Sequence, residues 1–200
     1  MPPSSLLREH GRIEIMPAAA RETDNSVKRA ASRGFSLIEL LIVVAIILII
    51  AAIAIPNLLR SRMSANQASA VANLRTISTA SVSYWVTYAN GYPPLLDSLG
   101  GVGAVANCDH AILVDETITS PPYQKSGYQF AYAGTLGNVA VSPPICSNPG
   151  FLGYLATATP MSNHVTGNIS YCSSEPGIIH YDLSGVVAPD SNTCDALPTL

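Results

Sequence analysis

Charged side chains are scarce in this sequence, where they make up 12% of 200 residues. Basic residues are fewest from Phe35 onward: Arg60, Arg62, Arg75 and Lys125 stand against nine acidic residues. Phosphate binding needs clustered lysine and arginine side chains. This balance therefore argues against a nucleic-acid partner.

Motifs for catalysis and for metal binding are also missing. The sequence has no Cys-x-x-Cys pair, which argues against a zinc site. It has no G-x-S-x-G nucleophile motif, and its histidines (His10, His110, His164 and His180) are scattered. His180 and Asp182 would share one face of a strand, but such pairs are commonly polar surface pairs. We therefore expect no enzyme, no metal and no cofactor.

Glycine and proline are absent from Phe35–Ile55, an apolar run of 21 residues with one charged side chain, Glu39. At ~1.5 Å per residue a helix of this length covers roughly 31 Å, which matches the hydrocarbon layer of a bilayer. Lys28, Arg29 and Arg33 lie directly before the run and favour a cytoplasmic N-terminal end. The sequence thus predicts a single membrane span with the C-terminus outside.

All cysteines fall in the part of the chain that is expected outside. They are Cys108, Cys146, Cys172 and Cys194. An even number of cysteines in an oxidising compartment favours two disulfides, with three possible connectivities. Four buried free thiols are the alternative.

The helix is expected to continue beyond the apolar run, because strong helix formers follow Pro56. An apolar stripe at helical spacing consists of Leu59, Met63, Ala70, Leu74, Ile77, Tyr84 and Tyr88. We predict one long helix from Phe35 to about Ala89, kinked at Pro56 and ended by the breakers of Asn90–Pro94. Residues 1–34 read as a disordered leader, and Met16 is an alternative start.

The rest of the chain predicts a small sheet. After a loop with one short helix at His110–Ile118, three β-rich stretches occupy residues 127–134, 151–160 and 168–185. Turn-rich segments separate them, as in an antiparallel meander of three or four strands. Packing this sheet on the amphipathic half of the helix gives an α+β fold. Residues 186–200 read as a loop held by Cys194.

The junction Gly34-Phe35-Ser36-Leu37-Ile38-Glu39 resembles the prepilin leader junction of the type IV pilin superfamily, which includes type IV pilins and the pseudopilins of type II secretion. The shared pattern is a basic leader, a glycine, a hydrophobic residue and a glutamate at the fifth mature position. Pro56 falls at the mature position where many pilins also have proline.

The resemblance implies a specific processing route. A prepilin peptidase would cut between Gly34 and Phe35 and methylate the new amine of Phe35. An inner-membrane assembly platform and its ATPase would then move the subunit from the lipid into a helical filament. A charged carboxylate among apolar side chains is costly unless it is paired. Glu39 is therefore expected to meet the Phe35 ammonium, within the subunit or from a neighbour, and to set the filament register.

The resemblance also implies the disulfide pairing. Cys172–Cys194 would hold the tail to the last strand, as in pilins, and Cys108–Cys146 would be the second bond. Major pseudopilins bind calcium in a C-terminal loop, and Asp190, Asn192 and Asp195 could supply oxygen ligands here. This tail has no obvious match to that loop, so a solvated acidic turn is the preferred interpretation.

Three domains follow: a cytoplasmic leader (1–34), a membrane and filament-core helix (35–55) and a periplasmic or extracellular pilin-like domain (56–200). The preferred function is a type IV pilus subunit, which leaves the inner membrane for an extracellular pilus. A pseudopilin in a periplasmic piston and a non-polymerising single-pass anchor are alternatives. A secretory signal peptide cut after Ala52-Ile53-Ala54 is a further alternative, but Glu39 and the continuing helix argue against it.

Overall fold

The computed structural model describes residues 34–101, 103, 105–139 and 146–200. The leader expected over residues 1–34 lies outside this description except for Gly34, as do Lys28, Arg29 and Arg33. The chain divides into two units, one ending at Val43 and one starting at Val44. Helix α1 (Leu37–Tyr88) runs through this boundary, and each unit is described by itself.

Helix α1 confirms the prediction of one long helix. It has 52 residues and passes through Pro56, the one proline inside it. Its end has a local cause: Ala89 takes a positive φ of 49° and Gly91 one of 76°. Residues in the left-handed region commonly end helices, and the prolines of NGYPP cannot continue one.

The sheet is an antiparallel meander with its strands in chain order. The strands are β1 (Gln124–Lys125), β2 (Tyr128–Asn138), β3 (Phe151–Pro160), β4 (Ser170–Ser174) and β5 (Ile179–Asp182). The meander and the α+β class are confirmed. The strand number is five rather than three or four, because residues 168–185 form a hairpin and a two-residue strand precedes β2.

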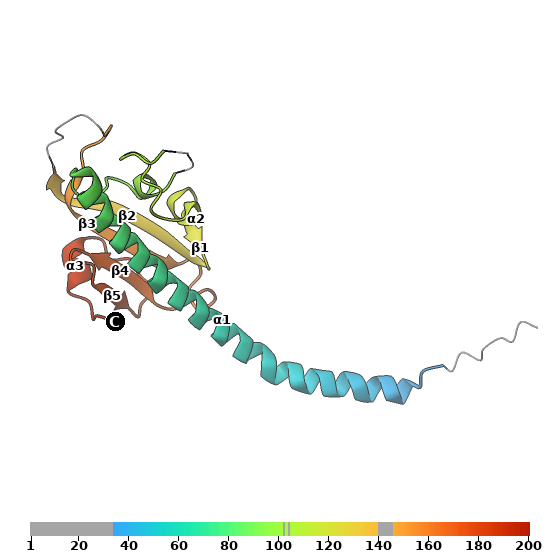
Figure 1. Ribbon diagram of the computed structural model, residues 1–200. Coiled ribbons are helices and arrows are strands. Elements are labelled where there is room, and N and C mark those ends of the chain that lie inside the picture. The colour runs from blue at the N-terminus through green and yellow to red at the C-terminus, as the bar shows by residue number, and fades with distance from the viewer. Residues whose placement is uncertain (1–33, 102, 104, 140–145) are drawn as a thin grey trace, which may run out of the picture. The chain divides into compact units, whose positions relative to one another are not determined.

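The main core lies between α1 and one face of the sheet, which we call the inner face (Figure 1). Alternate strand residues point to each face, so Tyr128 and Phe130 of β2 and Tyr154 of β3 all turn inward and are buried. From α1 the core receives Leu74 and Ile77. The apolar residues of the second half of α1 and the inward-facing residues of the strands thus form one core.

The predicted helix stripe is only partly correct. Ala70, Leu74, Ile77 and Tyr84 are buried, but Leu59 is 54% exposed. The hydrogen bonds between α1 and the rest of the domain start further along the chain, at Asn66, whose side-chain amide donates to the Thr166 carbonyl at 2.9 Å. The apolar period of the helix alone could not show at which residue of α1 the rest of the domain begins to cover it.

The segment between α1 and the sheet contains two short helices, η1 (Leu96–Leu99) and α2 (Glu116–Thr119). The helix expected at His110–Ile118 is therefore wrong in extent. The Asp115 carboxylate accepts from the Thr117 N–H at 2.8 Å and so caps α2 at its start. Ile112 has a φ of 53°, which breaks any helix through it.

The C-terminal segment covers the opposite, outer face of the sheet. A second apolar cluster there contains Leu155, Cys172, Ala188 and Cys194, with Leu197 against it. Part of this segment is helical, α3 (Ser191–Asp195), where a loop was expected. The Asp190 carboxylate caps α3 by accepting from the Thr193 N–H at 2.7 Å, and this bond lowers the pKa of that carboxyl.

The last residues pair with the edge strand β5. The Tyr181 N–H donates to the Pro198 carbonyl and the Leu200 N–H to the Ile179 carbonyl, each at 3.0 Å. The His180 ring Nδ1 lies 2.7 Å from the Leu197 carbonyl oxygen. These contacts occupy backbone groups that an edge strand would otherwise present to another chain.

Candidate assembly site at the start of the long helix

The first turn of α1 brings Ser36 and Glu39 together. Ser36 directly precedes the helix, and its carbonyl accepts from the Leu40 N–H at 3.2 Å. The Ser36 N–H donates to Oε2 of Glu39 at 3.0 Å. A glutamate that reaches back to the amide of the capping residue is one half of a capping box.

Ser36 is a residue that the sequence analysis missed. The signal was present, because serine followed three residues later by glutamate, ahead of an apolar run, is the pattern of a helix start. The glutamate was interpreted only through its charge. The structure adds that the carboxylate also satisfies one of the free N–H groups at the helix N-terminus.

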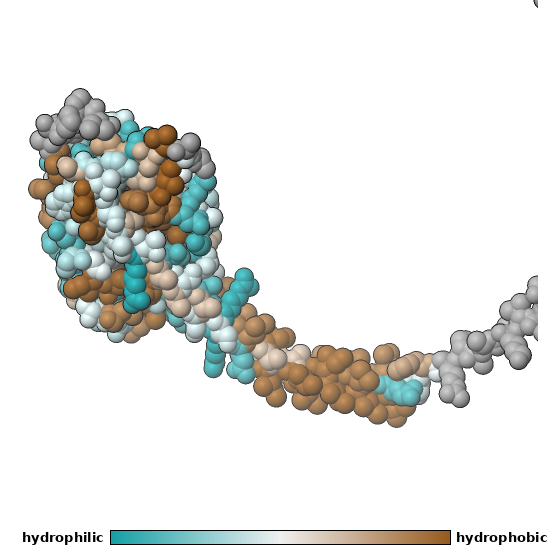
Figure 2. Space-filling view, viewed as in Figure 1, coloured by the Kyte–Doolittle hydropathy of each residue, from teal (hydrophilic) through white to brown (hydrophobic). Residues whose placement is uncertain are grey.

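The apolar side chains on either side of Glu39 are not covered by other described parts of the chain. Twelve large apolar side chains between Leu37 and Ile50 are each 45–80% exposed. Hydrophobic residues form a continuous surface on this part of α1 (Figure 2). Burying one such side chain fully is worth roughly 1.5–3 kcal/mol, so lipid or other helices would be strongly preferred to water. Among the described residues, α1 is the one helix long and apolar enough to cross a membrane.

The structure also describes the remaining residues that were predicted for this site. Gly34 and Phe35 precede α1, and the Phe35 side chain is 75% exposed. Pro56 lies inside α1 and supplies no N–H to the helix. The kink at Pro56 and the cut before Phe35 stay predictions.

The four cysteines form two disulfides, Cys108–Cys146 and Cys172–Cys194, with Cα atoms 5.4 Å and 6.0 Å apart. These are the pairs that the resemblance implied. The second bond joins α3 to β4, so it holds the C-terminal segment on the outer face of the sheet. Near the first bond, the Tyr84 hydroxyl donates to the Cys108 carbonyl at 2.7 Å.

The residues considered for a metal have structural partners instead. Asp190 caps α3, and the Asp195 carboxylate accepts from the Ser174 hydroxyl. Within the ranges that the structure covers, no three His, Cys, Asp or Glu side chains gather as a metal site would require.

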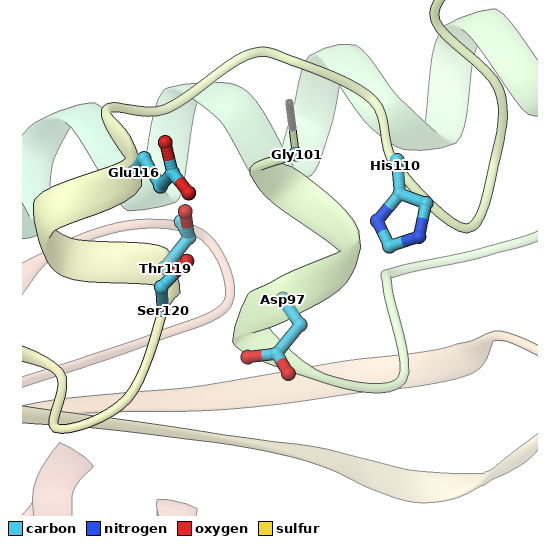
Figure 3. Close-up of a pocket in the computed structure, with 6 residues that line it drawn as sticks. All are labelled: Asp97, Gly101, His110, Glu116, Thr119 and Ser120. Carbon is cyan, nitrogen blue, oxygen red and sulfur yellow. The ribbon is translucent and has the colours of Figure 1, made fainter. Parts of the chain in front are cut away.

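A hollow of about 190 Å³ lies beside η1 and α2 (Figure 3). Its lining residues are Asp97, Gly101, His110, Glu116, Thr119 and Ser120. The close-up shows the Glu116 carboxylate beside Thr119, with the His110 ring on a separate loop. None of the motifs from the sequence analysis falls here.

Comparison with known proteins agrees with the helix start. Residues 29–55 match a family profile described as the prokaryotic N-terminal methylation motif. The chain is 52% identical over 54 residues to the type IV major pilin protein PilA of Myxococcus xanthus. It is 40% identical over 85 residues to PilA4, the type IV wide pilus major component of Thermus thermophilus.

The motif and the two matches support a member of the type IV pilin superfamily. The matches to these two pilins cover 27% and 41% of this chain. They span 24% of PilA and 64% of PilA4, less than two thirds of either relative. No solved structure matches this chain. The superfamily assignment therefore depends on the methylation motif and on partial alignments to two pilins.

Proposed function

We propose that this chain is a structural subunit of a type IV pilus-like filament and polymerises through the apolar part of α1. The observation that carries the proposal is the uncovered apolar surface of Leu37–Ile50 with one carboxylate, Glu39, in its first turn. Such a segment is stable in lipid or in a bundle of its own kind, but not in water. The pilus names of both relatives support a pilus subunit.

In this proposal each part of the chain has one task. Residues 1–34 are a leader that prepilin peptidase removes, and the amine of Phe35 becomes methylated. Residues 35–55 hold the subunit in the inner membrane and then form the filament core. Residues 56–200 lie outside the membrane from the start. The assembly platform and its ATPase move the subunit from one environment to the other.

Glu39 would fix how the subunits align. In the apolar core of a filament, its carboxylate and the ammonium of Phe35 from a neighbour neutralise one another. Any other stagger would leave both charges unpaired among apolar side chains, which is costly. Buried ion pairs are better attested as devices for register than as sources of stability.

The processing step is tested by mass spectrometry of the mature N-terminus. We expect N-methylated Phe35 at the start of the chain in sheared surface filaments. An N-terminus at Ile55 would instead establish a cleaved signal peptide. Recovery of the chain from membrane and periplasmic fractions alone, with no sheared filaments, would favour the pseudopilin.

The role of Glu39 is tested by Glu39→Ala in cells that carry the full assembly machinery. We expect peptidase cutting to continue while filament yield falls by at least about tenfold, the effect of ~1.4 kcal/mol per incorporated subunit. Glu116→Ala removes an exposed carboxylate from α2 and is the matched control, with wild-type yield expected. A Glu39→Ala protein that assembles normally would show that the chain is a plain anchor or uses another register device.

A further inference from the structure

A second hollow, of about 300 Å³, lies between η1 and β2. This volume is at the lower end of the range of ~300–1,000 Å³ that is typical of small-ligand pockets. Asp97 is the one lining residue that carries a charge at neutral pH. The apolar and aromatic side chains that line the hollow with it are Leu95, Leu96, Tyr123, Phe130 and Tyr132.

The Asp97 carboxylate has an oxygen without a partner. Its Oδ1 is shielded from solvent and has no hydrogen-bond partner among the described residues. The ion pair recorded in the same part of the chain joins Lys125 to Asp115 at 3.9 Å, so Asp97 has no cationic partner there. Figure 3 shows the Asp97 side chain apart from the His110 ring. Because buried polar atoms are nearly always paired in native folds, Oδ1 indicates a donor from outside the subunit.

Tyr123 lies beside the same carboxylate. A side-chain hydrogen bond with Asp97 raises the pKa of the Tyr123 hydroxyl. This hydroxyl is neutral, so it leaves the negative charge of Asp97 without a counter-ion. Aromatic rings attract cations through their faces. The carboxylate and the aromatic side chains of the hollow therefore favour a ligand of the same charge.

Strand β2 adds a backbone acceptor. The Phe130 N–H donates to the Tyr123 carbonyl at 2.8 Å, so the backbone groups of Phe130 face away from β3. Backbone direction alternates along a strand, so those of Tyr132 face the same way. The recorded pairing of β1 with β2 covers only residues 128 and 129, which leaves Tyr132 without a strand partner on that side within the described ranges. Its carbonyl can therefore accept from a donor in the hollow.

We propose that this hollow binds an organic cation that has a primary ammonium or guanidinium head and an apolar stem. The head donates to Oδ1 of Asp97 and to the Tyr132 carbonyl, which suits a group that carries several donors and no acceptor. The stem lies against the leucines of the η1 segment and Phe130. A free alkylamine and a lysine side chain of another protein share this chemistry. The site is independent of the filament function, because none of its residues belongs to α1.

The site is tested by nuclear magnetic resonance of the full chain in detergent micelles, with n-butylammonium as the probe. We expect saturable shifts at the amides of Asp97, Phe130 and Tyr132. Asp97→Asn should weaken binding at least about tenfold, as expected for loss of a hydrogen bond to a charged group. Asp182→Asn, on β5, is the matched control and should bind as the wild type does.

A neutral probe separates charge from apolar contact. n-Butanol has the same stem without the ammonium, and we expect it to bind at least about tenfold more weakly. Equal binding of the two probes would overturn the proposal, because the hollow would then be merely apolar. Equal affinity of Asp97→Asn and wild type for n-butylammonium would overturn it as well, as would the absence of saturable shifts at these amides. If Asp97→Asn does not fold, the comparison of the two probes decides the proposal.

A third probe identifies the source of the cation. Nα-acetyl-lysine methylamide carries the same ammonium on a peptide backbone. Tighter binding of this compound than of n-butylammonium would support the site and assign it to a lysine side chain of another protein. Weaker binding, still dependent on Asp97, would support the site and assign it to a free amine.

Discussion

At the scale of single residues, one close backbone approach restricts which residue the chain can carry before β3. A Cβ atom built on Gly150 would lie 1.6 Å from the Asn90 carbonyl oxygen and 2.8 Å from that of Tyr92. Both contacts are to backbone, which cannot rotate away as a side chain can. Gly150 therefore allows the chain before β3 to pass against the exit of α1.

Gly150→Ala is expected to lower the free energy of unfolding by about 1–3 kcal/mol, because the backbone must shift to admit the methyl group. The measurement is thermal or chemical unfolding of the full chain in detergent. Gly103→Ala is the control, since a Cβ there would have no atom of the described residues within 4 Å. Equal stability of the two variants would contradict this account of Gly150.

Some contacts of single residues could be predicted from the sequence, and others could not. The Ser36–Glu39 bond follows from a local pattern and was available from the sequence. The constraint at Gly150 was not, because it depends on Asn90, which lies 60 positions earlier in the chain. Local capping can be predicted from neighbours, whereas close approaches between distant segments require the fold.

At the scale of elements, the predictions succeeded for long segments with a regular apolar pattern. They failed for short helices whose ends are set by contacts with other residues. Helix α1 and strand β3 agree with the sequence within two residues at each end. Helix α2 was misplaced because its start depends on Asp115 and on the backbone at Ile112. Helix α3 was missed because five residues give no usable period, and its apolar partner Cys172 lies on another element.

The Cys172–Cys194 bond closes a separation of 22 residues. Replacing both cysteines with serine is expected to cost about 3 kcal/mol of stability from loop-closure entropy. The Leu200 amide, which donates to β5, should then exchange faster with solvent. Nuclear magnetic resonance of the oxidised and the substituted chain measures this exchange.

The Cys108–Cys146 disulfide is the control for removal of Cys172–Cys194. Removing Cys108–Cys146 in the same way should destabilise the segment before the sheet while the Leu200 amide keeps its protection. Loss of protection at Leu200 in both variants would mean that the tail is held by global stability and not by its own disulfide.

At the scale of the whole molecule, the core contains several tyrosines, and burial is the largest influence on their titration. Tyr84, Tyr128 and Tyr154 are buried, and burial raises the pKa of each hydroxyl. Burial, with the nearby Glu175 charge, raises the pKa of Tyr92 to about 12. In an unfolded chain these hydroxyls would ionise near pH ~10.

The domain should therefore lose stability in alkali. A folded-state pKa above the unfolded value gives a contribution that is complete below pH ~10 and is lost as the pH rises through the folded values. Absorbance at 295 nm measures tyrosine ionisation, and circular dichroism measures unfolding. We expect most tyrosines to ionise over the same pH range in which the domain unfolds. Tyr92→Phe should reduce the slope of stability against pH. Full ionisation near pH ~10 in a chain that stays folded would refute the prediction.

The pairing of Pro198–Leu200 with β5 has a practical consequence for anyone labelling this protein. Residues fused after Leu200 would start from within the sheet edge and would compete with the contacts that occupy it. An epitope or a fluorophore belongs instead in the turn between β3 and β4, where residues 162–165 are exposed. The carboxyl end of the chain is thus a poor place for a tag, although the Leu200 side chain is 62% exposed.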